Sequence, residues 1–307
     1  MKLLDAIIDK CYIKQWTYGL CHLKDRDVLA DGIDGLNFHW AAAPKDTRFY
    51  ADPFVFKTKH GEQVVIYEDY DNDDQYGKVS VDVLNADFSV KKQHTILDTG
   101  LHLSYPNVIH EHGKIYIMPE SSKEGDLCCY EYDEVLHTLV NKKTIIPNSG
   151  LLDSTILFHN NKYWLFATKR GDDSNAGLYI YFSNTWDGNY QPHPQNPVKT
   201  NLKGSRPAGN FIIQNGEIFR PAQNSSDYYG KSIIIHKIEK LDEQQFEEKP
   251  YKELFPLQNT RFNFAIHTIN ISDGVIVVDG LRKIFNPLAQ MKIFLCKRLK
   301  LNLKIND

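Results

Sequence analysis

Five segments of the chain each carry a polar residue beside a short apolar run, and these residues have side chains that can act on a sugar or hold an anion. In chain order they are Asp52, Tyr105, Asp153, Arg206 and His267. A carboxylate can act as general base or acid on a glycosidic bond, and an arginine fork matches a phosphate or carboxylate group. The intervals between the five are 53, 48, 53 and 61 residues. This spacing indicates a repeated structural unit that brings each of them to the same place.

A second series of polar residues follows the first at a nearly constant distance. It consists of Glu68, Glu120, Lys169 and Arg220, with Gln223 just beyond, at offsets of 16, 15, 16 and 14 residues. We expect both series to surround one site. A neutral glycan requires no cations, so Lys169, Arg206 and Arg220 favour a ligand that carries a phosphate, pyrophosphate or carboxylate group.

Roles for these residues follow from their types. Asp52 is the candidate general base, Glu120 is its candidate partner acid, and Asp153 is a third catalytic candidate. The candidates for substrate binding are Glu68, Tyr105, Lys169, Arg206, Arg220, Gln223 and His267. A structural interpretation stays open: the aspartates could accept backbone hydrogen bonds, the arginines could pair with the two glutamates, and the histidine could be a buried strand residue. No cofactor and no metal is expected, because the histidines and cysteines lack ligand spacing.

The repeat predicts the fold. Each unit has a short apolar run, a turn and a second apolar run, and residues 63–68 alternate with the period of two that is typical of a strand. The turns contain Gly or Asn, which accept positive φ: His60-Gly61, His112-Gly113, Asn160-Asn161, Asn215-Gly216 and Asp273-Gly274. Units of this length with several short strands are typical of propeller blades. We therefore predict an all-β fold, a five-bladed β-propeller, with a pair of β-sandwich domains as the alternative.

The chain is predicted to form a single domain over residues 1–307. The expected blades are 48–100, 101–148, 149–200, 201–258 and 259–300, with a closing segment over 1–47. Residues 2–12 are expected to form a short amphipathic helix. Between residues 282 and 304, seven Lys and Arg alternate with apolar residues. This segment is predicted to be a closing strand with a solvated basic edge, and contact with an anionic membrane face is the alternative.

Composition excludes several classes of protein. With 307 residues, 42% of them hydrophobic, the chain can bury a large core. The net charge of −3 does not favour binding to nucleic acid. The five cysteines are odd in number, no apolar run reaches the roughly 18 residues of a membrane span, and the N-terminus lacks the apolar region of a signal peptide. A reducing cytoplasmic location is expected, with peripheral membrane contact as a further option.

Eight stretches together resemble a known family. They are RFYADPFVF, HLSYPNVI, IMPESS, LLDSTILF, KYWLFAT, PHPQNPV, SRPAGN and FRPAQNSSDYYG. They are similar to the β-propeller module at the N-terminus of plant glucosamine inositolphosphorylceramide transferases, and to bacterial proteins of surface-polysaccharide loci in which it is sometimes joined to a sugar formyltransferase. The resemblance covers residues 16–279. It implies a role in glycan biosynthesis, although the glycosyltransferase domain of the plant enzyme is a separate downstream module.

A more distant resemblance is to five-bladed glycosidases such as arabinanases and β-xylosidases. It implies that Asp52, which precedes Pro53, stands in the place of their general base. Their second blade carries an Asp where this chain has Tyr105, and their general-acid Glu has no evident counterpart beside Asp153 and Lys169.

These observations predict a carbohydrate-active protein of surface-polysaccharide or glycolipid biosynthesis. Glycosyl transfer that involves a sugar nucleotide, or a phosphorylated or acidic glycan, is the favoured activity. The alternatives are a glycosidase-like hydrolase with Asp52 as base and a non-catalytic glycan-binding module that partners a separate synthase. In an enzyme, a base and an acid would face an open pocket. In a binding module, these carboxyl groups would instead be held in ion pairs with arginines.

Overall fold

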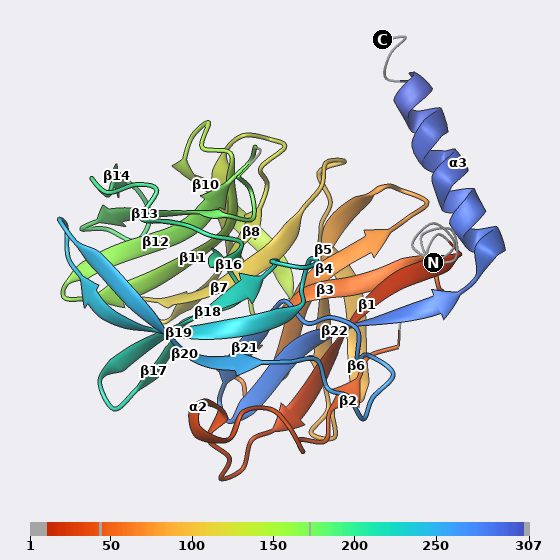
Figure 1. Ribbon diagram of the computed structural model, residues 1–307, viewed down its shortest axis with the longest axis horizontal. Helices are drawn as coiled ribbons and strands as arrows, with labels where there is room; N and C mark the ends of the chain where they lie inside the picture. Colours follow the sequence, from red (N-terminus) through yellow and green to blue (C-terminus); the bar gives the residue numbers. More distant parts are fainter. Residues whose placement is uncertain (1–10, 43–44, 172, 304–307) are drawn as a thin grey trace.

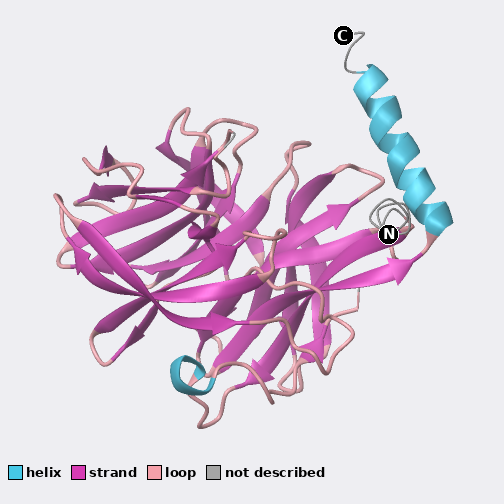
Figure 2. Ribbon diagram, viewed as in Figure 1, coloured by secondary structure: helices cyan, strands magenta, loops and turns pink. Residues whose placement is uncertain are grey.

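Strands make up most of the regular secondary structure in the computed structural model, which describes residues 11–42, 45–171 and 173–303 (Figure 2). They form five sheets of four or five strands each (Figure 1). The prediction of a five-bladed β-propeller is confirmed, and the alternative of two β-sandwich domains is wrong.

The first three blades follow chain order from the inner strand outward. The first consists of β3 (Arg48–Lys57), β4 (Gln63–Asp71), β5 (Tyr76–Leu84) and β6 (Val90–Leu97). The second consists of β7 (Ser104–Glu111), β8 (Lys114–Glu120), β9 (Leu127–Asp133) and β10 (Thr138–Ile146). The third consists of β11 (Leu151–His159), β12 (Lys162–Lys169), β13 (Gly177–Ser183), β14 (Gln191–Pro192) and β15 (Lys199–Thr200).

The last two blades differ from this pattern. In the fourth, β16 (Lys203–Pro207) and β17 (Ile212–Gln214) both pair with β18 (Glu217–Asn224), followed by β19 (Ser232–Leu241) and β20 (Phe246–Leu254). The fifth joins β21 (Ile269–Ser272) and β22 (Val275–Phe285) to β1 (Tyr12–His22) and β2 (His39–Trp40) from the other end of the chain. Because β1 pairs with β22 along its whole length, from Tyr12↔Phe285 to His22↔Val275, it closes the ring and leaves no free edge between the two.

The hairpin turns have the chemistry that the sequence predicts. The pairs 112–113, 160–161, 215–216 and 273–274 have positive φ at both residues. This is the geometry of type I′ turns, whose twist matches that of the flanking strands. Local turn chemistry therefore fixes the pairing of β7 with β8, β11 with β12, β17 with β18, and β21 with β22.

The core lies between neighbouring blades. Phe56 and Ile66 of the first blade, each with 0% exposure, share a cluster with Val108 and Ile117 of the second. Interiors of this kind are close-packed and resist deformation. The inner strands thus form a rigid frame for the side chains at the axis.

The two ends of the chain differ from each other. The predicted helix over residues 2–12 falls almost entirely on residues outside the described ones. The predicted closing strand is correct only as far as Phe285, because the helix α3 (Pro287–Leu303) follows and projects from the propeller (Figure 1). Asn286 accepts a hydrogen bond from Ala289 N at 3.1 Å, and Pro287 suits the first helical position, so this pair starts a helix. Within the described part of the chain, no helix combines the length and the apolar content that crossing a bilayer requires.

Candidate functional site

Asp52, Tyr105 and Asp153 occupy equivalent positions on the inner strands β3, β7 and β11. Each has a positive φ, of 50°, 41° and 50° respectively. Strand pairing is interrupted at each of them, between Ala51 and Phe54, Ser104 and Asn107, and Leu152 and Thr155. A left-handed residue other than glycine at such a bulge costs of order 1–3 kcal/mol, so three equivalent ones point to a function. The backbone conformation thus confirms that these three residues occupy equivalent positions in their blades, as predicted.

Asp52 is linked through His267 to a third residue, Asp279. Asp52 Oδ1 lies 3.1 Å from His267 Nε2, and His267 Nδ1 lies 2.7 Å from Asp279 Oδ2. Thr268 Oγ1 also donates to Asp52 Oδ1, at 2.8 Å. Asp279, on β22, accepts hydrogen bonds from the backbone N–H groups of His267 and Thr268. All four residues are buried.

This arrangement keeps Asp52 ionised and His267 protonated. Burial opposes the charged imidazolium, but Asp279 and Asp52 outweigh it and raise the pKa of His267 to about 10. Burial also opposes the Asp52 carboxylate, but the cationic His267 and the Thr268 hydroxyl lower its pKa below the ordinary value. At neutral pH Asp52 is therefore a carboxylate able to accept a proton.

Arg206 holds Asp153 from the fourth blade. Its Nε lies 2.5 Å from Asp153 Oδ2 and its Nη2 3.1 Å from Asp153 Oδ1, which is a two-point contact. Its Nη1 donates to Asn175 Oδ1 at 3.1 Å, and Gln223 Nε2 donates to Asp153 Oδ2 at 3.0 Å. Both oxygens of Asp153 are thus occupied, whereas Arg206, with five N–H groups, retains donors for a further partner.

Glu120 and Glu68 are the two carboxyl groups of the site whose pKa values are raised. Glu120 Oε2 lies 3.7 Å from Arg206 Nη2, and Ser122 Oγ donates to Glu120 Oε1 at 2.9 Å. Burial and the nearby Asp153 raise the pKa of Glu120 to about 8. Burial, Asp52, Glu120 and Asp153 raise the pKa of Glu68 well above its usual range. We refer to the following residues together as the axial cluster: Asp52, Glu68, Glu120, Asp153, Arg206, His267 and Asp279.

Tyr105 supports the axial cluster and is not a free ligand contact. Its hydroxyl accepts a hydrogen bond from Gly209 N at 2.7 Å, which leaves its O–H to donate to Thr155 Oγ1 at 2.8 Å. One to four residues further along the chain from Asp52, Tyr105, Arg206 and His267, hydrogen bonds join four blades: Asn107 to Asn210 at 2.6 Å, Asn210 to Asn270 at 2.7 Å, and Asn270 to Pro53 at 2.8 Å. These contacts fix the positions of the inner strands relative to one another.

Two aromatic residues complete the site and were not predicted. The Trp16 ring lies 4.2 Å from the His267 ring, and the Tyr229 ring lies 5.1 Å from it. Trp16 is buried, whereas Tyr229 is 42% exposed and also lies 5.8 Å from the Arg206 guanidinium. Tyr229 therefore connects the axial cluster to solvent.

Three residues of the site were not predicted from the sequence: Tyr229, Asp279 and Trp16. They differ in how clearly the sequence points to them. Tyr229 lies inside the quoted stretch FRPAQNSSDYYG. Asp279 is a lone acid in the apolar run VIVVDG, and a charged residue in such a run is either paired or functional. Trp16 has no comparable signal, because its contact with His267 depends on closure of the ring by β1.

The structure does not bring Lys169 and Arg220 into the axial cluster. Lys169 is exposed, and its ammonium lies over the ring of Tyr179, 4.6 Å from the ring centre. Arg220 is buried and pairs with Glu248 at 2.7 and 2.8 Å, and it also donates to the carbonyls of Ser205 and Gly204. Arg220 overcomes the effect of burial on Glu248 and lowers the pKa of this carboxyl to about 2. These four hydrogen bonds donated by Arg220 therefore all stay within the fourth blade.

Asp52, His267 and Asp279 could together hold a metal ion, since each offers a ligand atom and these atoms lie within 4.8 Å of one another. Each nitrogen of His267, however, faces a carboxylate oxygen. A protonated imidazole at these ion-pair distances, 3.1 and 2.7 Å, balances the charge of the two carboxylates without an ion.

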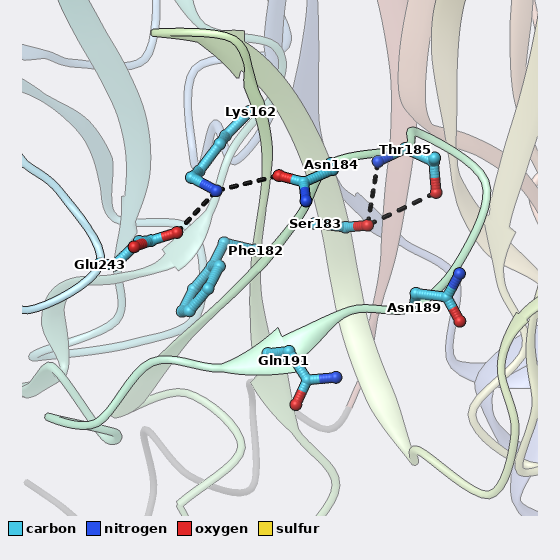
Figure 3. Close-up of a pocket in the computed structure, with 8 residues that line it drawn as sticks. All are labelled: Lys162, Phe182, Ser183, Asn184, Thr185, Asn189, Gln191 and Glu243. Carbon is cyan, nitrogen blue, oxygen red and sulfur yellow. Dashed lines mark hydrogen bonds and ion pairs between the residues drawn. The ribbon is translucent and has the colours of Figure 1, made fainter.

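A separate hollow lies at the edge of the third blade (Figure 3). It has a volume of about 320 Å³. Lys162 Nζ lies there 2.9 Å from Asn184 Oδ1 and 2.6 Å from Glu243 Oε1 (Figure 3). Its charged groups pair with each other, and none of the predicted site residues lines it. The axial cluster is therefore the stronger candidate for a functional site.

Two solved structures with a similar fold are glycosidases. The catalytic domain of the GH62 α-L-arabinofuranosidase from Coprinopsis cinerea matches with a TM-score of 0.57 and 10% identity, over 78% of this chain and 93% of that one. An α-L-arabinofuranosidase from Podospora anserina, solved with cellotriose, matches with a TM-score of 0.57 and 11% identity, over 73% and 78%. At such low identity the similarity concerns the fold alone.

Sequence comparison identifies closer relatives. A protein named glucosamine inositolphosphorylceramide transferase 1 from Oryza sativa subsp. japonica is 30% identical over 219 residues, which are 66% of this chain and 28% of that protein. The Arabidopsis thaliana protein of the same name is 34% identical over 157 residues, 50% of this chain and 20% of that protein. The match thus spans between a fifth and little more than a quarter of the length of these relatives. A family model described as glucosamine inositolphosphorylceramide transferase 1, N-terminal, matches residues 39–262, and the chain belongs to this family.

Proposed function

We propose that this propeller acts on a glycan in glycan biosynthesis, and that it carries out glycosyl transfer by acid–base chemistry at the axial cluster. One observation carries the proposal. The pKa of Asp52 is lowered, whereas the pKa of Glu120 is raised to about 8. Carboxyl groups of one buried cluster whose pKa values diverge in this way can supply a base and an acid at the same pH.

The contacts of Asp52 suit a general base. Among the described residues, the side-chain hydrogen bonds and ion pairs to Asp52 reach Oδ1, from Thr268 and His267. Oδ2 is left to accept the proton of an acceptor hydroxyl. As the new bond forms between this hydroxyl oxygen and the sugar carbon, the bond to the leaving group breaks. Protonated Glu120 then transfers its proton to the leaving oxygen.

Arg206 and Tyr229 are the proposed ligand contacts. Arg206 retains N–H donors that suit a phosphate or carboxylate, and the exposed Tyr229 ring offers an apolar face to a sugar. The names of the relatives mention glucosamine and inositolphosphorylceramide. A glucosamine nucleotide and a phosphoinositol glycan are therefore the first ligands to test. Asp153, with both oxygens occupied, is proposed as a positioning residue for Arg206.

The test compares Asp52→Asn and Glu120→Gln with the wild type on a panel of sugar nucleotides and phosphorylated glycans. Asp52→Asn keeps the shape of the side chain while removing its basicity, so we expect turnover to fall by about 10²–10⁴ with binding retained. Asp87→Asn, at an exposed acid, is the matched control. Mass spectrometry in isotopically labelled water separates transfer from hydrolysis. Turnover of Asp52→Asn at the wild-type rate would contradict the assigned role.

A non-catalytic glycan-binding module is the second candidate. It is favoured by the occupied oxygens of Asp153 and by the chain from Asp52 to Asp279, which cross-link blades and could serve the architecture alone. Calorimetry with the same panel separates the two candidates. Binding without turnover by the wild type, and with unchanged affinity in Asp52→Asn, would favour the binding module.

A further inference from the structure

The helix α3 presents large apolar side chains to solvent. Leu288, Met291, Phe294 and Leu295 are 76, 56, 54 and 49% exposed. At about 100° per residue, these four lie within about one third of the circumference of the helix. Phe285, at the end of β22, is 63% exposed. Single exposed apolar residues are ordinary, but a continuous group of them marks a contact surface. We call Leu288, Met291, Phe294 and Leu295 the apolar stripe.

The apolar stripe is not the face by which α3 packs on the propeller. Ile293, which lies about opposite the centre of the stripe, is only 7% exposed. Lys292 Nζ lies 2.8 Å from Asp73 Oδ1, and Asn286 Nδ2 donates to Asp46 Oδ2 at 3.2 Å. These contacts hold the base of the helix while the rest projects from the body of the molecule (Figure 1). The stripe therefore faces away from the propeller.

The charge of the helix indicates which kind of surface can contact the apolar stripe. Its sequence over 287–303 contains Lys292, Lys297, Arg298 and Lys300 and no Asp or Glu. The exposed Arg298 lies on the same side of the helix as the stripe, with its guanidinium 4.8 Å from the centre of the Phe294 ring. Two copies of this helix would bring like charges together, whereas an anionic lipid surface accepts both the apolar stripe and the cations. Asp73, at its base, is matched by Lys45 as well as Lys292.

We propose that α3 is an interfacial helix that docks the propeller on an anionic lipid surface. The apolar stripe enters the boundary between headgroups and acyl chains, and Arg298 contacts the headgroups. This proposal is independent of the axial cluster and of its chemistry.

The test is co-sedimentation of the full chain with vesicles. We expect binding to phosphatidylcholine vesicles that contain about one third phosphatidylserine, weak binding to phosphatidylcholine alone, and a decrease as salt is raised. The variant Leu288→Ser/Met291→Ser/Leu295→Ser should bind at least about tenfold more weakly. Arg298→Glu should weaken binding to the anionic vesicles in particular.

The matched control is Val135→Ser/Leu136→Ser, which removes exposed apolar groups, 70% and 60% accessible, from the β9–β10 turn. It should bind as the wild type does. Because every substituted residue is exposed, unfolding curves should coincide for all variants. Absence of wild-type binding to anionic vesicles, or equal loss in the control, would overturn the proposal. So would a dimer, detected by light scattering, that the triple variant abolishes.

Discussion

Replacing Glu120 by Gln should stabilise the protein at neutral pH and leave it unchanged in acid. Glutamine imitates the protonated carboxyl in size and can still accept the hydrogen bond from Ser122. The wild-type side chain, by contrast, is buried beside Asp153, which raises its pKa from 4.5 to about 8. Folding between these two pH values therefore requires Glu120 to take up a proton.

The magnitude follows from this shift. A carboxyl with a raised pKa in the folded state contributes stability fully below pH 4.5 and loses it as the pH rises through about 8. At pH 7 the protein is about 2.5 units above the ordinary pKa, which at about 1.4 kcal/mol per unit costs about 3 kcal/mol. Because Glu120 is already mostly protonated in the folded wild type at pH 7, Arg206, 3.7 Å from Glu120 Oε2, loses no charged partner in the variant. We expect Glu120→Gln to stabilise by about 1–3 kcal/mol at pH 7 and by about zero at pH 4.

Urea unfolding followed by tryptophan fluorescence at pH 4, 7 and 8.5 measures the difference. Glu247→Gln, at an exposed position, is the matched control and should show no pH-dependent gain. A Glu120→Gln variant that is destabilised at every pH, or whose difference from wild type is the same at pH 4 and 8.5, would refute the reasoning. In that case a raised pKa of Glu120 could not explain a loss of turnover in the Glu120→Gln variant.

Other substitutions test the frame and the charges. Gly209→Ala should lower the free energy of unfolding by more than about 3 kcal/mol in urea titrations, since φ is +128° and a Cβ would lie 1.9 Å from a backbone oxygen of β21. Gly188→Ala, with nothing within 4 Å, should be close to neutral. Arg206→Met should cost about 3–5 kcal/mol in the same assay, because Asp153 is left buried without its cation. His267 has a pKa of about 10, so its contribution is fully present below pH 6.5 and is lost as the pH rises through 10. Wild-type stability should therefore fall across this range, by up to about 5 kcal/mol, and His267→Gln should flatten the fall.

The sequence by itself determined the architecture. Period-two alternation and turns rich in Gly and Asn are local properties, so they report strands and hairpins without knowledge of the rest of the chain. Five such units could be counted, and the equivalence of Asp52, Tyr105 and Asp153 followed from their position in the unit. That equivalence is visible as three bulges with positive φ.

Tertiary structure alone decided which charges meet. Arg206 and Arg220 were both predicted to bind an anionic ligand, yet Arg206 reaches Asp153 in the neighbouring third blade and Arg220 pairs with Glu248 inside its own blade. Asp279 joins the axial cluster because β22 lies beside β21 in the blade that β1 closes. Ion pairs depend on distances of a few ångströms between strands far apart in the chain, and closure of the ring sets these distances. The pKa values, and with them the proposed base and acid, follow from the same closure.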